Sequence, residues 1–359
     1  MNNHLLVSIT TVLAVLLACT ENEYPDLTVI QMTVTDTLGT NTGDEHYVFG
    51  SIECVRVDSE SRILVLDGVN CMIRVYSASG DYLHSFGGRG SGPGEFLDPV
   101  SFAVLNNGNI AVADWEAWRI WLFDSSHEYI GELGPFPDGA PLSIRAGSGG
   151  SIVGLGLSFA NAGDEFDGEY HVSAWADSTA PYFEYLSGEV AISAGESGEI
   201  TISYPDVCFD TDSCGTVFAA LSTDSTWCVE RISVSGESEV FVRQNWSRAA
   251  WSPEAKAALD QFFEETGNEI GASDQFAPGI TGVYCDGFSR VWIRSGTAAH
   301  PLFHIYSEGG ELLQAAECQE LFDPLCELDF VFAENAVLAW NTDPADYPKV
   351  YVFRNPFAL

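Results

Sequence analysis

The residue types that offer chemistry in this chain include two aspartates and a cluster of tryptophans. Asp210 and Asp212 stand two residues apart in the segment FDTDSCG, 209–215, which has the spacing of the first half of a calcium-binding loop. Carboxylate oxygens suit Ca²⁺, but the segment lacks the later ligands, including a bidentate glutamate. These two aspartates are the candidate metal ligands, and calcium is the one cofactor that the sequence leaves open.

Three tryptophans, Trp115, Trp118 and Trp121, fall within seven residues. Trp118 and Trp121 are three apart on an expected strand, so they lie on opposite faces. An exposed tryptophan in a loop can bind a ligand or a sugar ring, whereas a buried one packs neighbouring sheets together. Trp115 and Trp118, with Arg89 in the bend before them, are the predicted ligand-binding residues. Packing is the alternative for all three tryptophans and is favoured for Trp121.

Other signatures of catalysis are missing from the sequence. No GxSxG, P-loop or HExxH motif occurs. His300 and His304 have Pro301 between them, so they do not form a helical metal pair. Asp114 and Arg119 are expected to tie two strands together. The sequence therefore supplies no catalytic residue and favours a protein that is not an enzyme.

Nine cysteines are present. One of them, Cys19, ends an apolar leader, and the other eight form an even number in a chain expected to be exported, which favours disulfides. The local candidates are Cys318 with Cys326, and Cys208 with Cys214 across a hairpin loop. The alternative is that several are small buried apolar residues. No Cys-x-x-Cys motif occurs, so zinc is not expected.

The first eighteen residues are expected to be a targeting segment, 1–18. Their apolar stretch is too short to span a bilayer and ends in LLAC, 16–19, which resembles the bacterial lipobox. That resemblance implies that Cys19 is lipidated and that 19–26 is a tether. Acyl chains would anchor the protein stably, because each buried CH₂ contributes about 0.8 kcal/mol. The alternative is an ordinary secretory signal.

The charge of the chain is strongly one-sided. It has 52 acidic and 14 basic residues, a formal net charge of −38, and only two lysines, Lys256 and Lys349. Such a surface repels nucleic acid and anionic lipid headgroups. Nucleic acid is therefore excluded as a partner, and contact with a membrane is expected only through the N-terminal lipid. A solvated acidic surface is the simplest explanation of the charge.

The candidate residues lie on short alternating runs that recur along the chain. The segment 62–87 aligns without a gap on 109–134, with Asp67 on Asp114, a shift of 47 residues. Runs of four to six residues with period-two alternation indicate strands, and the Asn-Asn-Gly turn at 106–108 marks a hairpin. A fixed period of this size with several strands in each unit is typical of a β-propeller.

The repeat resembles the NHL type. It has a strand led by Pro99, a second strand that ends in Asp114, a third that begins with Arg119, and a bend FGGRGSGPGEF at 86–96. The resemblance implies an all-β, six-bladed propeller over 27–359. The amidating lyases, a zinc enzyme family with similar repeats, have a histidine where this chain has Val100 and Ser101, so that activity is not expected.

Six units can be placed on the sequence, and the ring needs an end that closes it. The units are 47–96, 97–140, about 141–200, a fourth from 202, a fifth over 281–315 and a C-terminal sixth of three strands. The alternating strand 27–36 has no nearby partner. We expect it to pair with the last strand, 349–354, as the missing outermost strand, because closure removes exposed edges.

One segment breaks the β pattern. Residues 252–267 have Ser252 as N-cap, Pro253 at the first helical position and Gly267 past the end. They predict a helix inserted in blade four, within an insertion at about 246–279.

Three functions remain open from the sequence. The first is an exported, lipid-anchored scaffold of the bacterial cell envelope that binds a protein, peptide or glycan. The second is a calcium-dependent hydrolase of the propeller lactonase type, which only fold analogy supports. The third is a structural envelope protein without a small-molecule site.

Overall fold

The computed structural model describes most of the chain. The described residues are 29–162, 165–194, 200–203, 206–222, 226–245, 249–250, 276–277, 279–295, 301–318, 328–341 and 347–357. The predicted signal segment with Cys19 and the tether, the predicted helix 252–267, and Cys326 lie outside them. Within these ranges, no helix has the length and apolar character needed to cross a membrane.

The described residues form seven sheets, which are six blades and one separate pair of short strands, and within a blade most strands follow one another along the chain. Blade one has β3 (Cys54–Val57), β4 (Ile63–Asp67), β5 (Met72–Tyr76) and β6 (Tyr82–Gly87), and blade two has β7 (Pro99–Val104), β8 (Ile110–Asp114), β9 (Arg119–Phe123) and β10 (Tyr129–Leu133). Blade three has β11 (Ser143–Ala146), β12 (Ile152–Ala162), β13 (Glu165–Trp175), β14 (Phe183–Ala194) and β15 (Ile200–Ser203).

The other three blades follow the same antiparallel plan. Blade four has β16 (Asp206–Thr211), β17 (Val217–Ser222), β18 (Trp227–Ile232) and β19 (Ser238–Gln244), and blade five has β22 (Gly282–Cys285), β23 (Arg290–Ser295), β24 (Leu302–Ser307) and β25 (Leu312–Cys318). Blade six has β26 (Leu328–Phe332), β27 (Ala336–Asn341) and β28 (Val350–Arg354).

Burial along the strands explains why these sequences form them. The middle strands β4 and β8, ILVLD and IAVAD, are buried at every position because both of their faces pack against neighbouring blades. Short apolar runs rich in β-branched residues are typical of strands that are buried on both faces. The outer strand β6 instead alternates between half-buried and exposed residues, because one of its faces meets solvent.

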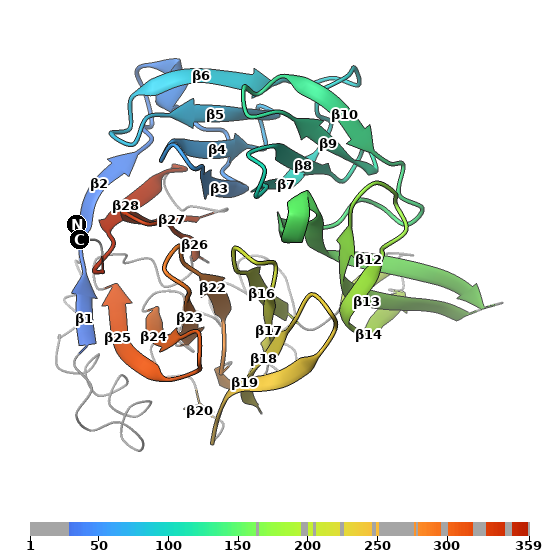
Figure 1. Cartoon of the computed structure of the whole chain (residues 1–359). Helices are drawn as coiled ribbons and strands as arrows, with labels where there is room; N and C mark the ends of the chain where they lie inside the picture. The colour runs from blue at the N-terminus through green and yellow to red at the C-terminus, as the bar shows by residue number, and fades with distance from the viewer. Residues whose placement is uncertain are drawn as a thin grey trace, which may run out of the picture.

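The six blades are arranged in a closed ring (Figure 1). Their innermost strands contact one another in sequence order, β3, β7, β11, β16, β22 and β26, and β26 in turn contacts β3. Apolar side chains fill the space between adjacent blades; Leu64 and Ile73 of blade one, for example, share a cluster with Phe102 and Val112 of blade two. The prediction of an all-β propeller with six blades is confirmed.

The N-terminal segment differs from the single strand predicted at 27–36. It forms two strands, β1 (Val29–Met32) and β2 (Val34–Leu38), on two different blades. Strand β1 pairs in parallel with β25 of blade five, and β2 pairs antiparallel with β28 as the outermost strand of blade six.

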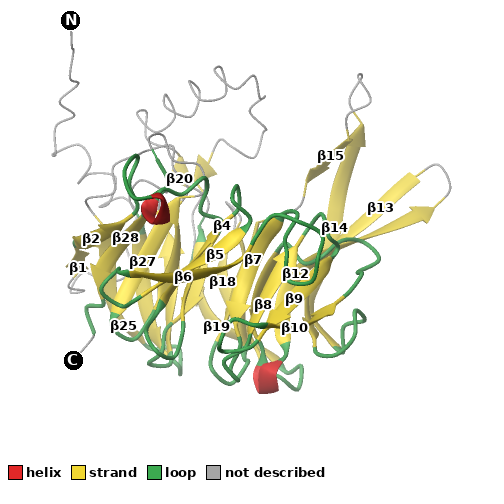
Figure 2. Ribbon diagram, turned by 90° about the horizontal axis from the view of Figure 1, so that it is seen from above, coloured by secondary structure: helices red, strands yellow, loops and turns green. Residues whose placement is uncertain are grey.

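Two further features depart from the regular pattern of the blades. The third blade has much longer strands than the others, and β13 and β14 project from the ring (Figure 2). Between blades four and five, β20 (Ala249–Ala250) pairs with β21 (Phe276–Ala277) as a separate two-stranded sheet, so the chain leaves and returns at one place within the predicted insertion. The helical elements of the described residues are two 3-10 turns, Glu45–Tyr47 and Ser148–Gly150.

Candidate functional site

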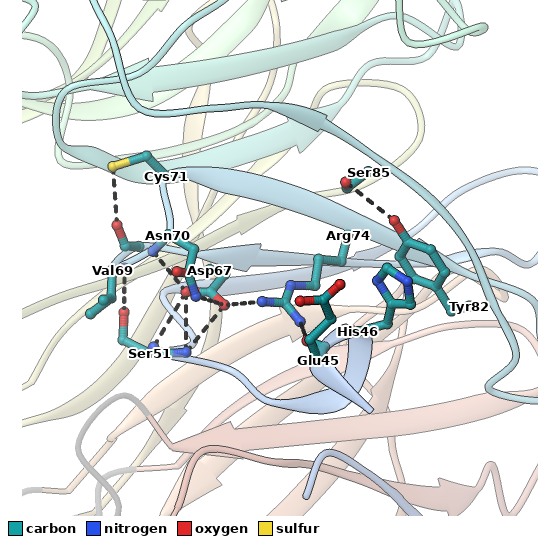
Figure 3. Close-up of polar contacts among 12 residues, drawn as sticks. Glu45, His46, Ser51, Asp67, Val69, Asn70, Cys71, Arg74, Tyr82 and Ser85 are labelled. Atoms are coloured by element: carbon teal, nitrogen blue, oxygen red, sulfur yellow. Dashed lines mark hydrogen bonds and ion pairs between the residues drawn. The ribbon is translucent and has the colours of Figure 1, made fainter. Parts of the chain in front are cut away.

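A buried carboxylate organises the turn between the second and third strands of blade one (Figure 3). Asp67 is fully buried at the end of β4. It accepts hydrogen bonds from the backbone N–H groups of Gly50, at 3.1 Å, and Asn70, at 3.0 Å. The guanidinium of Arg74 lies 3.1 Å from the same carboxylate. A buried charge must be paired and hydrogen-bonded in this way, so the turn that carries Val69 is held in one conformation.

The same arrangement recurs in blade two around Asp114, which is also fully buried. Its carboxylate accepts the N–H groups of Leu97, at 2.8 Å, and Ala117, at 3.0 Å, and the indole N–H of Trp121, at 3.1 Å. Trp121 is therefore a packing and hydrogen-bonding residue. Asp114 and Arg119 face each other across β8 and β9 as predicted, but they do not form an ion pair, because the guanidinium of Arg119 lies 2.6 Å from Glu132.

These fixed turns present exposed side chains at their tips. Val69 is 57 % exposed and Trp118 is 48 % exposed. Trp118 has a φ of 58°, and its N–H and C=O are both bonded, to Trp115 and Phe136. Both turns follow the second strand of their blade, so they open on the same side of the ring.

The three predicted ligand-binding residues have different environments. Arg89 is exposed and donates to the carbonyl of Val69 at 3.1 Å, so the structure brings it to the blade-one turn. Trp115 packs against Gly139, where a Cβ would come within 2.8 Å of its ring, and it is only partly exposed. We call Val69, Arg89 and Trp118 the turn face. The exposure of Val69 gave no signal in the sequence.

A second set of residues surrounds the axis of the ring. In each blade, a turn joins the first strand to the second. The first residue of this turn donates its backbone N–H to the carbonyl of the last residue, as Asp58 does to Arg62 in blade one. The residue two positions before the start of this turn lies on the innermost strand of its blade. It is structurally equivalent in all six blades, but its residue type differs from one blade to the next. These side chains, which we call the axial ring, are Arg56, Ala103, Arg145, Asp210, Tyr284 and Val331.

The charged members of the axial ring reach toward the next blade. Arg145 of blade three forms an ion pair with Asp210 of blade four, with Nε 3.1 Å from Oδ1, and the two side chains are 17 % and 18 % exposed. The other oxygen of Asp210 accepts the N–H of Cys285 of blade five at 2.8 Å. Burial raises the pKa of Asp210, and the nearby Arg145 opposes this rise.

Arg56 and Tyr284 complete the polar part of the axial ring. Arg56 lies 5.9 Å from the ring centre of Phe102, and burial lowers the pKa of its guanidinium, as does the charge of Arg145. Burial raises the pKa of Tyr284 well above its usual value, and the nearby carboxylate of Asp329 in blade six acts in the same direction. The axis is therefore lined by both signs of charge rather than by converging acids.

The candidate metal ligands do not point at one site. The carboxylate of Asp212 accepts the backbone N–H groups of Cys214 and Thr216, both at 2.9 Å, and so closes its own turn. Asp210 is committed to Arg145. In the part of the chain that the structure describes, no three His, Cys, Asp or Glu side chains are grouped to hold a metal ion.

The predicted disulfides are not formed where the structure can test them. Cys208 lies on β16 and Cys214 in the turn that follows, and the two are thiols rather than a bonded pair. Cys318 is buried as a thiol at the end of β25, and its predicted partner, Cys326, lies outside the described residues. Burial raises the pKa of Cys318 to about 12, which suits a small core residue.

A cavity of about 270 Å³ lies on the rim of the ring, apart from both sets of residues. It is half open to solvent and is lined by β2, by Tyr47, and by the turn 78–80 of blade one. No member of the turn face or of the axial ring lines it.

Comparison with known proteins agrees with the fold. A family model described as a 6-bladed beta-propeller matches residues 38–135. A solved structure from Bacteroides vulgatus, described as a member of the duf4221 family, is 9 % identical with a TM-score of 0.51, covering 90 % of this chain and 97 % of that one. A Bacteroides fragilis protein whose name describes it as exported is 14 % identical with a TM-score of 0.50, covering 91 % and 99 %. No curated protein matches the chain.

Proposed function

We propose that this protein is an exported, lipid-anchored scaffold that binds a protein, peptide or glycan through its turn face. The observation that carries the proposal is Trp118, a large aromatic side chain that is 48 % exposed in a left-handed backbone conformation. The left-handed φ recurs at the buried Cys71, the equivalent residue of blade one, so it belongs to the repeated turn, and the exposure of its side chain is what distinguishes Trp118.

The turns around Trp118 suit binding because they are already ordered. Asp67 and Asp114 each accept a backbone N–H of the turn and one of the segment before the first strand of the blade, which fixes the turns before any ligand arrives. A preorganised surface loses little conformational freedom on binding, and exposed Trp and Arg side chains supply much of the energy in known interfaces. Arg89 and Val69 add a charge and an apolar contact beside one of these turns.

The other two functions have less support. A calcium-dependent hydrolase needs converging oxygen ligands, whereas Asp210 and Asp212 are committed to an arginine and to a turn. A purely structural role would give no use to the exposed indole of Trp118.

Binding arrays test the proposal directly. The full chain is applied to glycan and peptide arrays, and hits are measured in solution against Trp118→Ala. We expect the substitution to weaken binding at least tenfold, because central tryptophans typically contribute 2 kcal/mol or more. The matched control is Tyr182→Ala, since Tyr182 is 56 % exposed on the turn after the third strand of blade three, at the other end of the strands. Equal loss in both variants, or no loss in Trp118→Ala, would refute the turn face as the binding site.

The anchor is tested separately. The motif LLAC at 16–19 supports lipidation of Cys19, and a protein of similar fold is named as exported. Cys19→Ala should move the protein from the membrane fraction to the soluble fraction and abolish palmitate labelling. A variant that stays in the membrane fraction would contradict the anchor.

A further inference from the structure

Two arginines occupy the same position of the axial ring in blades one and three, but only one has a carboxylate partner. Arg145 pairs with Asp210 at 3.1 Å. Arg56 donates one hydrogen bond, from Nη1 to the carbonyl of Val55 at 2.8 Å, and within the described ranges no carboxylate forms an ion pair with it. Although the chain has 52 acidic residues, the other N–H groups of the Arg56 guanidinium have no carboxylate as acceptor within the described ranges.

The electrostatics of the axis favour an anion at Arg56. A guanidinium has five N–H donors, so Arg56 can offer a forked pair to a planar partner. Its neighbour Arg145 carries the same charge and acts against the charged form of Arg56. A buried or half-buried charge is costly unless it is paired. An anion seated here would satisfy the donors and relieve the repulsion between the two arginines.

We propose that Arg56 anchors a carboxylate-binding site on the axis of the propeller. The planar fork of a guanidinium matches a carboxylate with two parallel hydrogen bonds. The ring of Phe102, with its centre 5.9 Å from the guanidinium carbon, is fully buried and supports the arginine from the side of blade two. The partial exposure of Arg56, and of the Arg145–Asp210 pair beside it, leaves the position accessible.

The charges around the site favour a single negative charge on the ligand. Asp210 and Asp329 both act on Arg56 with the opposite sign to Arg145. These two carboxylates also repel an anionic ligand, and they repel a dianion such as phosphate more strongly than a monoanion. The ligand class is thus an organic monocarboxylate, either a small acid or the C-terminus of a peptide.

This inference does not depend on the turn face, because the axial ring shares no residue with it. Trp118→Ala should leave carboxylate binding unchanged. If ligand binding is found at only one of the two sites, only the proposal for the other site is refuted.

Three small probes of similar shape test the site. Benzoate, benzamide and phenyl phosphate are titrated into the full chain, and binding is followed by calorimetry and by the shift in Tm. We expect benzoate to bind, and benzamide and phenyl phosphate to bind at least tenfold more weakly. Equal binding of benzoate and phenyl phosphate would overturn the preference for a monocarboxylate, and no binding of benzoate at millimolar concentration would overturn the site.

Substitutions locate the binding. Arg56→Gln should weaken benzoate at least tenfold, and Arg56→Lys should weaken it less, because the charge remains while the fork is lost. Arg354→Gln, at an exposed arginine on β28, is the matched control and should have no effect. If Arg56→Gln does not fold, the graded loss in Arg56→Lys carries the test. Unchanged binding in the folded Arg56 variants would refute the assignment.

The source of the carboxylate is then distinguished with a peptide. N-acetyl-alanyl-phenylalanine with a free C-terminus is compared with its amide. Acid binding at least tenfold tighter than that of benzoate identifies a peptide C-terminus, whereas affinity equal to or below that of benzoate identifies a small acid.

Discussion

Asp67 and Arg74 form a buried ion pair at 3.1 Å in blade one, and the equivalent residues of blade two replace the arginine by a tryptophan. There the indole N–H of Trp121 donates to Asp114, also at 3.1 Å. The carboxylate is constant while its donor changes from charged to neutral. The role of the carboxylate is therefore to accept hydrogen bonds from backbone N–H groups of the turn, and the side-chain donor satisfies its remaining hydrogen-bonding capacity.

We expect Asp67→Ala to be strongly destabilising. It removes four backbone and side-chain hydrogen bonds at distances of 2.9–3.1 Å and leaves Arg74 buried without its carboxylate. Loss of one partner of a buried pair typically costs about 3–5 kcal/mol. Urea unfolding measures the change, with the exposed Asp81→Ala as control. A double variant with Arg74→Met should lose less than the sum of the single variants, because the unpaired charge is gone.

The pairing of β2 with β28 should contribute to the stability of the whole ring. Leu38 of β2 is only 4 % exposed and packs with Trp340 and Val350 of blade six. Leu38→Ala should lower the free energy of unfolding by about 2–4 kcal/mol. Leu313→Ala, on the outer strand of blade five and 45 % exposed, is the matched control and should change it by less than about 0.5 kcal/mol. Equal effects would show that β2 is not a structural part of blade six.

Two histidines make the contact between blades one and two sensitive to acid. Nε2 of His84 lies 2.6 Å from Nδ1 of His127. Burial lowers the pKa of His127 to about 4, and the charges of Arg62 and His84 lower it in the same direction. Asp58 and Asp124 act in the opposite direction and raise this pKa. The pKa of His84 is lowered by burial and by Arg62.

The sign of the pH effect follows from these depressed values. Between pH 4 and about 6.5, the unfolded chain holds more protons on His127 than the folded one, so stability falls as the pH falls through this range. We expect His127→Asn, which tolerates the φ of 69° at this position, to reduce this fall by about 1–3 kcal/mol. Urea unfolding at pH 7 and pH 5 measures it; parallel pH profiles for variant and wild type would contradict the prediction.

Trp118 should be unfavourable for stability. Its φ of 58° is disfavoured for a bulky side chain, whereas asparagine adopts this region readily. Trp118→Asn should therefore keep or raise the free energy of unfolding, by up to about 1 kcal/mol. A large loss of stability in thermal or urea unfolding would instead make Trp118 a packing residue.

The cysteines should behave as thiols. Cys214 is exposed, whereas Cys54 and Cys71 are buried. Alkylation of the folded protein should modify Cys214 first, and Cys54 and Cys71 only after denaturation, because reaction requires an accessible thiolate. Peptide mass mapping reads this out. Protection of Cys214 that is lost on adding a reductant would restore the disulfide predicted from the sequence.

The sequence carries the local part of this fold. The aligned segments 62–87 and 109–134 predicted the four-stranded blades, because alternating apolar runs and turn residues act over a few positions and do not depend on distant contacts. Asp67 and Asp114 marked the ends of the same strands. The acidic composition predicts, on electrostatic grounds, that nucleic acid is not a partner, and this stays a prediction.

Only the tertiary structure decided which residues meet. Arg119 was expected to pair with Asp114, but the carboxylate lies inside the blade with Trp121 while Arg119 lies at the surface with Glu132. The split of the N-terminal segment between two blades depends on where the edges of blades five and six lie after the ring has closed. Arg56, Arg145 and Asp210 come from three different blades, so no spacing along the chain could place them around one axis.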